Sequence, residues 1–162
     1  MDIESRTHRV LVADDDQSIR RLVCTIVKRE NLQVDCVADG QQAIDMLKQH
    51  EYSVILLDLM MPNVNGFGVI EYLRTHPPAR KPVVLVISAY ADQKYKDVDP
   101  TVVAGVLRKP FEVADIGNLV RQCVEGFRDA TRHESGRVPQ ELIETLNIKG
   151  GVSRGGGGEQ SH

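Results

Sequence analysis

Short apolar runs alternate along the chain with longer segments in which apolar residues recur every three or four positions. The runs fit buried strands and the periodic segments fit amphipathic helices. The predicted strands cover residues 9–13, 32–37, 54–58, 82–87 and 102–107. The predicted helices cover residues 18–30, 40–49, 66–75 and 113–127. Because strands that alternate with helices form βαβ units, the pattern predicts an α/β fold with a parallel sheet covered on both faces.

Local signals define several helix ends. Ser18 is a plausible N-cap for the first helix, and Asp39 with the following glycine opens the second. Two prolines in residues 76–78 end the third helix. A fourth helix is expected within residues 91–103, but Pro100 interrupts that stretch and its apolar periodicity is thin. We therefore expect a short, shifted or irregular helix there.

The chain of 162 residues, 41% of them hydrophobic, fits one domain with an appendage. We assign residues 9–128 to the domain and residues 1–8 to an N-terminal extension. Residues 129–162 are a polar, glycine-rich tail, in which a short helix near residues 139–148 would need a surface to dock on.

Charge and cysteine usage exclude several classes of protein. The net charge is −3 and no basic cluster is present, so direct nucleic-acid binding is not expected. No apolar run approaches the roughly 18 residues of a membrane span, and no signal region precedes the domain. Cys24, Cys36 and Cys123 show no disulfide or C-x-x-C spacing, and we interpret them as reduced core residues of a soluble cytoplasmic protein.

Polar side chains stand where the predicted strands end. They are Asp14, Asp15, Asp58, Ser88 and Lys109. In a parallel sheet the carboxyl ends of the strands share one edge, so these side chains should converge. Neighbouring carboxylates repel one another, and hard oxygen ligands of this kind suit Mg²⁺. Lysine and serine side chains pair with phosphate oxygens, so the set predicts a phosphoryl pocket in which Asp58 is the nucleophile.

A plainer interpretation exists for each of these residues. Asp58 could simply end a strand, Asp14 could be an ordinary strand-end acid, and Lys109 could be a solvated lysine. The chain also has no G-x-x-x-x-G-K-[ST] motif and no G-x-G-x-x-G after a strand. The phosphoryl group must therefore come from another molecule.

Four separated motifs resemble the receiver domain of two-component response regulators, of the stand-alone type. They are the pair Asp14-Asp15, Asp58 with the loop M-P-N-V-N-G, Ser88-Ala89, and Lys109-Pro110-Phe111. The resemblance spans about residues 9–127. It implies a flavodoxin-like, doubly wound sheet of five parallel strands in the order 2-1-3-4-5.

The resemblance also implies a mechanism. Asp58 would accept a phosphoryl group from a sensor histidine kinase or a histidine phosphotransfer protein, and Ser88 and Lys109 would contact the phosphoryl oxygens. The implied Mg²⁺ ligands are Asp15, Asp58, the backbone carbonyl of Met60 and, through water, Asp14. Such a protein is not otherwise an enzyme, because it catalyses only its own Mg²⁺-dependent phosphorylation and dephosphorylation. It signals by phosphorylation-dependent binding to a downstream protein.

Several positions depart from the family pattern or vary within it. Many receivers carry an aromatic residue three positions before the lysine, where this chain has Val106. Met60 and Tyr90 stand where side-chain bulk could control water access to the phosphate. We interpret Arg20 as a charge on the helix surface.

Other functions stay open. An aspartate-nucleophile phosphatase usually has a second acid two residues after the nucleophile, and here that residue is Met60. The chain could instead be a phosphorelay intermediate, or a receiver fragment of a larger regulator or hybrid kinase. We expect no insertion of this protein into a membrane.

Overall fold

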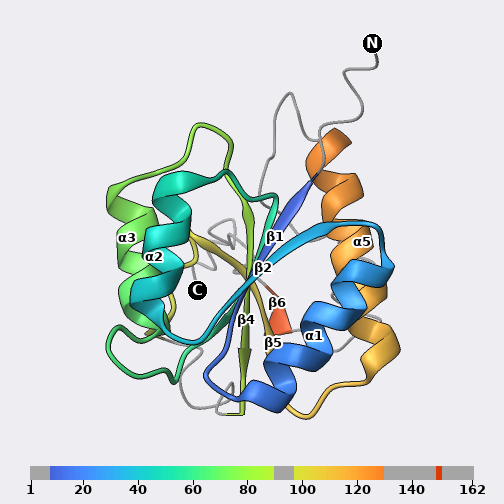
Figure 1. Cartoon of the computed structure of the whole chain (residues 1–162). Helices are drawn as coiled ribbons and strands as arrows, with labels where there is room; N and C mark the ends of the chain where they lie inside the picture. The colour runs from blue at the N-terminus through green and yellow to red at the C-terminus, as the bar shows by residue number, and fades with distance from the viewer. Residues whose placement is uncertain (1–7, 90–96, 130–148, 151–162) are drawn as a thin grey trace, which may run out of the picture.

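The computed structural model of the protein describes residues 8–89, 97–129 and 149–150 (Figure 1). Five parallel strands form most of its sheet: β1 (Arg9–Ala13), β2 (Gln33–Val37), β3 (Val54–Asp58), β4 (Val83–Ser88) and β5 (Val103–Arg108). Their order is β2-β1-β3-β4-β5, which confirms the predicted doubly wound topology.

Helices cover both faces of this sheet. In Figure 1, α1 (Gln17–Arg29) and α5 (Val113–Asp129) lie on one side, and α2 (Gly40–Gln49) and α3 (Gly66–Thr75) lie on the other. Each side has its own apolar core, because the strand side chains point alternately to the two faces. All five residues of β3 are buried, which explains why its sequence reads as a continuous apolar run.

The N-caps differ from prediction in one helix. Helix α1 is capped by Asp16 and not by Ser18, because the Asp16 carboxylate accepts a 3.0 Å hydrogen bond from the amide of Ile19. A carboxylate is also favoured by the positive end of the helix dipole. Helices α2 and α3 begin as predicted, with Asp39 and Asn65 as their caps.

The cysteines correct another expectation. Cys24 of α1 and Cys36 of β2 form a disulfide, so the prediction that all three cysteines are reduced was wrong. The prediction of a core position also fails for Cys36, which is exposed, whereas Cys24 and Cys123 are buried. The physical reason is that α1 packs beside the edge strand β2, which brings the two cysteines together.

The sheet also has a sixth strand that the sequence did not predict. β6 (Lys149–Gly150) pairs antiparallel with β5, with Val106 opposite Lys149 and Gly105 opposite Gly150. The tail thus returns to the free edge of β5. The helix expected near residues 139–148 lies outside the described residues, and so do residues 91–96 of the stretch in which a fourth helix was expected. The rest of that stretch, residues 97–102, is described and contains turns but no α-helix.

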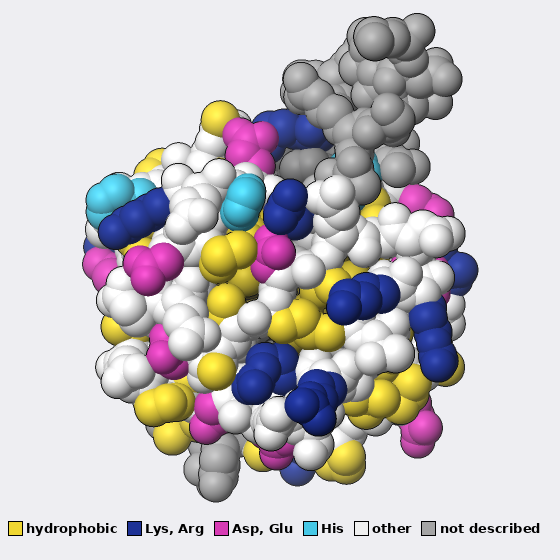
Figure 2. All heavy atoms as spheres, viewed as in Figure 1, with side chains coloured by type: hydrophobic (Ala, Val, Ile, Leu, Met, Phe, Trp, Pro, Cys, Tyr) yellow, Lys and Arg dark blue, Asp and Glu magenta, His cyan; other side chains and the backbone are white. Residues whose placement is uncertain are grey.

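The surface shows no single large basic patch on the face drawn in Figure 2, where Lys and Arg side chains are spread among acidic, apolar and neutral ones. Among the described residues, no helix combines the length and apolar character needed to span a membrane.

The pairing of β6 with β5 can be tested by replacing Lys149 and Gly150 with proline, which cannot donate a backbone hydrogen bond. We expect hydrogen exchange at Gly105 or Val106 to accelerate about fivefold, the factor equivalent to one lost hydrogen bond of about 1 kcal/mol. Exchange is measured residue by residue by NMR.

The matched control replaces Gly155 and Gly156 with proline, beyond the strand, and should leave exchange in β5 unchanged. Equal exchange in both double variants would contradict the pairing.

Candidate functional site

The strand register brings the predicted site residues to one edge of the sheet. Ala13 of β1 lies beside Leu57 of β3, so Asp14, the next residue, is level with Asp58. Carboxylate oxygens of Asp14, Asp15 and Asp58 all lie within 4.8 Å of one another. Asp14 and Asp58 are buried, and Asp15 is exposed. The predicted convergence of the three acids is therefore present.

Lys109 reaches the same acids from the end of β5. Its ammonium group lies 2.9 Å from Asp14 Oδ2 and 3.6 Å from Asp58 Oδ2, and its side chain is only 16% exposed. Lys109 and Asp14 are 95 residues apart in sequence. The alternative in which Lys109 is an ordinary solvated lysine does not fit this position.

Ser88 joins the site at the end of β4. It is completely buried, and its backbone carbonyl accepts a 3.1 Å hydrogen bond from the backbone amide of Lys109. This bond ties the ends of β4 and β5 together. Tyr90, considered as a control on water access, lies outside the described residues.

The loop after β3 fixes the position of Asp58. The Met60 amide donates a 3.2 Å hydrogen bond to Asp58 Oδ1, while the Met60 side chain is 47% exposed. The loop then folds back, and a Cβ atom on Gly66 would lie 2.5 Å from the carbonyl oxygen of Asp58. Only glycine allows the start of α3 to approach the backbone of Asp58 this closely.

The Asp14 loop is held by two groups whose role the sequence analysis missed. The amide of Asp16 donates to Asp14 Oδ1 at 2.9 Å, and Arg20 Nη1 donates to the Asp14 carbonyl at 2.8 Å. Arg20 is half-buried and is not the simple surface charge that we expected. The sequence signal that could have indicated this role is the position of Arg20 near the start of a helix that directly follows three acids.

Burial and charge together set the protonation of the site. Burial raises the pKa of Asp58 to about 6, the Lys109 cation opposes that rise, and the Asp14 carboxylate adds to it. Burial alone would lower the pKa of Lys109, but its hydrogen bond to Asp14 and the negative charges of Asp58 and Asp14 outweigh burial and raise it. The pocket therefore favours the protonated form of Lys109 and disfavours ionisation of Asp58.

The donor set fits a divalent cation. Three carboxylates within 4.8 Å offer hard oxygen ligands, and one lysine cannot balance their charge. The residues that could hold such an ion are Asp14, Asp15 and Asp58. For Met60, the structure establishes the amide contact with Asp58, and its carbonyl remains a predicted ligand.

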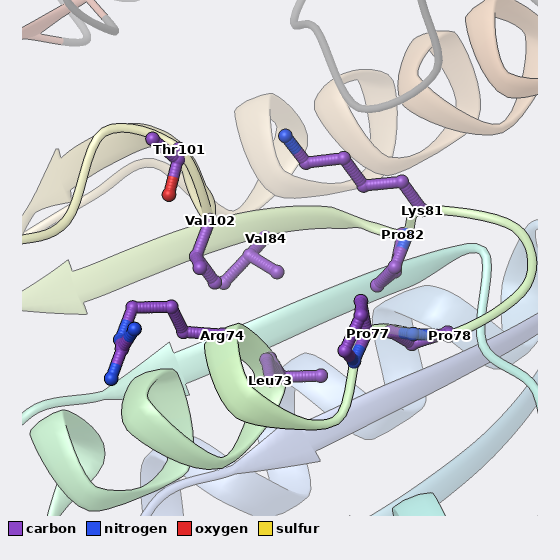
Figure 3. A pocket seen from close by; sticks show the side chains of 9 residues that line it. All are labelled: Leu73, Arg74, Pro77, Pro78, Lys81, Pro82, Val84, Thr101 and Val102. Atoms are coloured by element: carbon purple, nitrogen blue, oxygen red, sulfur yellow. The ribbon is translucent and has the colours of Figure 1, made fainter.

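A separate cavity of about 260 Å³ lies near the amino end of β4, away from the carboxyl ends that carry the acids (Figure 3). It is lined by Leu73, Arg74, Pro77, Pro78, Lys81, Pro82, Val84, Thr101 and Val102. Val84 is near the amino end of β4, whereas Ser88 is at its carboxyl end. The cavity has no carboxylate among its lining residues, so it is not part of the acidic site.

The family model described as the response regulator receiver domain matches residues 10–121. The transcriptional regulatory protein SrrA of Staphylococcus aureus is 25% identical over 143 residues, which cover 88% of this chain and 58% of SrrA. The chain therefore spans less than two thirds of the length of this curated relative.

Solved structures show the same fold. The receiver domain of the Francisella response regulator 1452 is 26% identical, with a TM-score of 0.65 over 78% of this chain and 100% of that chain. Response regulator TrrA from Thermotoga maritima, solved in complex with Mg²⁺ and BeF, is 22% identical, with a TM-score of 0.64 over 72% of this chain and 99% of that chain. The TrrA likeness supports the fold alone.

The raised pKa of Asp58 predicts how stability depends on pH. An unfolded aspartate has a pKa of about 4. Between about pH 4 and the native value of about 6, the folded protein binds more protons than the unfolded chain, so its stability falls as the pH rises. Asp58→Asn should therefore stabilise the metal-free protein at pH 7.5 by about 1–3 kcal/mol, and the gain should shrink towards pH 4.

Urea denaturation of the metal-free protein at several pH values measures this effect. Asp16→Asn is the matched control, because it removes a neighbouring acid and asparagine also caps helices well. A gain for Asp58→Asn that is independent of pH would contradict the assignment of the shift to Asp58.

Proposed function

The chain belongs to the response regulator receiver domain family, and we propose that it accepts a phosphoryl group on Asp58 from a phosphohistidine of a sensor kinase or a histidine phosphotransfer protein. The observation that best supports this role is the placement of the buried Asp58 carboxylate 3.6 Å from the Lys109 ammonium and beside two further acids. A cytoplasmic location belongs to the same proposal.

In the proposed transfer, a carboxylate oxygen of Asp58 attacks phosphorus. The new O–P bond forms as the N–P bond to the donor histidine breaks, and the histidine leaves with the bonding electron pair. The Lys109 ammonium group neutralises negative charge on the phosphoryl oxygens during this step, and the Ser88 hydroxyl donates a hydrogen bond to one of these oxygens. Lys109 is suited to this role because it already bridges the acids at the ends of β1 and β3.

Mg²⁺ is the proposed cofactor, held by Asp15, Asp58, the Met60 carbonyl and, through water, Asp14. When bound, it would offset the negative charge shared by the acids and the phosphoryl group. The cluster supports this choice because carboxylate oxygens are the ligands that Mg²⁺ prefers in proteins.

Phosphorylation would signal by shifting the conformational population towards a form that binds a downstream protein. Val106, in the position of the usual aromatic residue, is buried in the core beneath α2 and α3. An inward swing of an aromatic ring is therefore not available to this chain at that position. We propose instead that phosphorylation changes the contacts of Lys109 and, through them, the backbone conformation at the carboxyl end of β5.

An aspartate-nucleophile phosphatase is less well supported. Its general acid would stand two residues after the nucleophile, where this protein places the exposed, non-ionisable side chain of Met60. The same geometry suits a receiver, which holds its phosphoryl group for signalling and does not need rapid turnover.

Phosphoryl acceptance can be tested by intact mass spectrometry after incubation with acetyl phosphate and Mg²⁺. We expect one phosphoryl adduct in the wild type and none in Asp58→Asn. Lys109→Gln should slow adduct formation at least tenfold, because it removes the cation next to Asp58.

Asp16→Asn serves as the control, since it leaves all the proposed phosphoryl contacts in place. If Asp58→Asn still gained one adduct, Asp58 would not be the acceptor.

Magnesium should also change the titration of the cluster. Because a cation relieves the repulsion between the acids, we expect Mg²⁺ to lower the pKa of Asp58 from its metal-free value of about 6. Carbon-13 NMR of the aspartate carboxylates, with and without Mg²⁺, measures the change. Asp39, the buried cap of α2, provides an internal control that should not move. Identical Asp58 titrations in both conditions would count against metal binding.

A further inference from the structure

The disulfide between Cys24 and Cys36 joins two elements that border the acidic site. Cys24 lies in α1, whose N-cap follows Asp14 and Asp15 directly, and Cys36 lies in β2. Among the described strands, β2 is an edge strand that pairs only with β1 (Figure 1). The bond therefore ties the outermost strand of the sheet to the helix that starts at the acids.

The backbone places the two cysteines for this bond. Cys36 is paired with Val12, and Val12 and Val34 pack in the core beneath α1 and α5. Because side chains alternate along a strand, Cys36 faces the α1 side of the sheet, as Val34 does. The Cα atoms of Cys24 and Cys36 lie 6.7 Å apart, within the range that a disulfide spans.

The surroundings of the two sulfur atoms differ. Cys24 is 7% exposed and packs among apolar side chains, so its thiol is compatible with a folded reduced state. Cys36 is exposed, and it lies in β2, the strand at one end of the sheet. An external thiol or disulfide can therefore reach Cys36 without unfolding the core.

The third cysteine is placed differently. Cys123 in α5 is completely buried and is a free thiol. Burial raises the pKa of the Cys123 thiol to about 12, which leaves almost no reactive thiolate at neutral pH. Exchange with an external disulfide therefore begins at Cys36, the exposed cysteine, and not at Cys123.

We propose that Cys24 and Cys36 are a reversible dithiol–disulfide site, oxidised by a small-molecule disulfide that enters at Cys36. The Cys36 thiolate attacks one sulfur of the small disulfide, forms a mixed disulfide and releases one thiolate. The Cys24 thiolate then attacks the Cys36 sulfur, closes the protein disulfide and releases the second. Two protein thiols and one small disulfide give one protein disulfide and two small thiols, so two electrons pass to the small molecule.

The bond should change stability as well as thiol count. Closing a loop between cysteines 12 residues apart restricts the unfolded chain. Reduction should therefore lower the melting temperature by roughly 10 °C. Because this measurement needs no phosphoryl donor, its outcome is independent of the proposed function.

The test equilibrates the full chain in buffers of varied reduced and oxidised glutathione, quenches with acid and alkylates the free thiols in denaturant with iodoacetamide. Intact mass should show three alkyl groups under reducing conditions and one under oxidising conditions, with both thiols of the pair lost together. Peptide mapping should place the remaining group on Cys123.

Two variants serve as controls. Cys36→Ser, at an exposed position, should show no intramolecular bond at any glutathione ratio and no reduction-dependent change in melting temperature. Cys123→Ala should keep the transition, with two alkyl groups when reduced and none when oxidised. Three alkylated thiols at every ratio would overturn the proposal, as would a bond that resists millimolar dithiothreitol in the folded protein. Disulfide-linked dimers as the main oxidised product, seen on a non-reducing gel at low protein concentration, would also overturn it.

Discussion

The structure depends most on how three carboxylates are held together at the carboxyl ends of the central strands β1 and β3. Asp14 and Asp58 are buried, so water screens their repulsion poorly. The ammonium group of Lys109 lies within 4 Å of both, at 2.9 and 3.6 Å, and offsets part of their charge. One cation cannot balance three acids. Burial and, after it, the Asp14 carboxylate raise the pKa of Asp58. The negative charge that Lys109 leaves unbalanced explains why a divalent cation fits the cluster.

The backbone, more than the side chains, keeps these groups in place. Asp14 and Asp15 follow β1, Asp58 ends β3, and the parallel register makes the two strand ends level. Main-chain contacts then lock the loops: Lys109 donates to the Ser88 carbonyl, Arg20 donates to the Asp14 carbonyl, and Gly66 lies against the carbonyl of Asp58. Conservative changes to the carboxylates should therefore alter the chemistry of the site while the fold persists, which is why Asp58→Asn is informative.

The features that were predictable from sequence are those with local signals. Apolar periodicity located the strands and helices, and strand ends that stop on polar residues located Asp14, Asp58, Ser88 and Lys109. Where two capping residues stood close together, the choice of Ser18 was wrong, because geometry and helix dipole both favour an acid at the helix start. The Cys24–Cys36 bond depends on how α1 packs against β2, and β6 has only two residues, so neither leaves a periodic pattern in the sequence.

Those two unpredicted features occupy the two edges of the parallel sheet. Sheet edges are the parts that pair with other chains and open most easily. Here a covalent bond secures β2 and a returning segment pairs with β5, while the three acids extend from β1 and β3 in the interior. A change at the β2 edge can therefore alter stability without touching a carboxylate. β5 is different, because its last residue, Arg108, is followed by Lys109, whose ammonium group contacts the carboxylates of Asp14 and Asp58. A change in the pairing of β5 with β6 could therefore shift Lys109 relative to the acids. Of the two edge strands, β5 thus has the more direct influence on the chemistry of the acidic site.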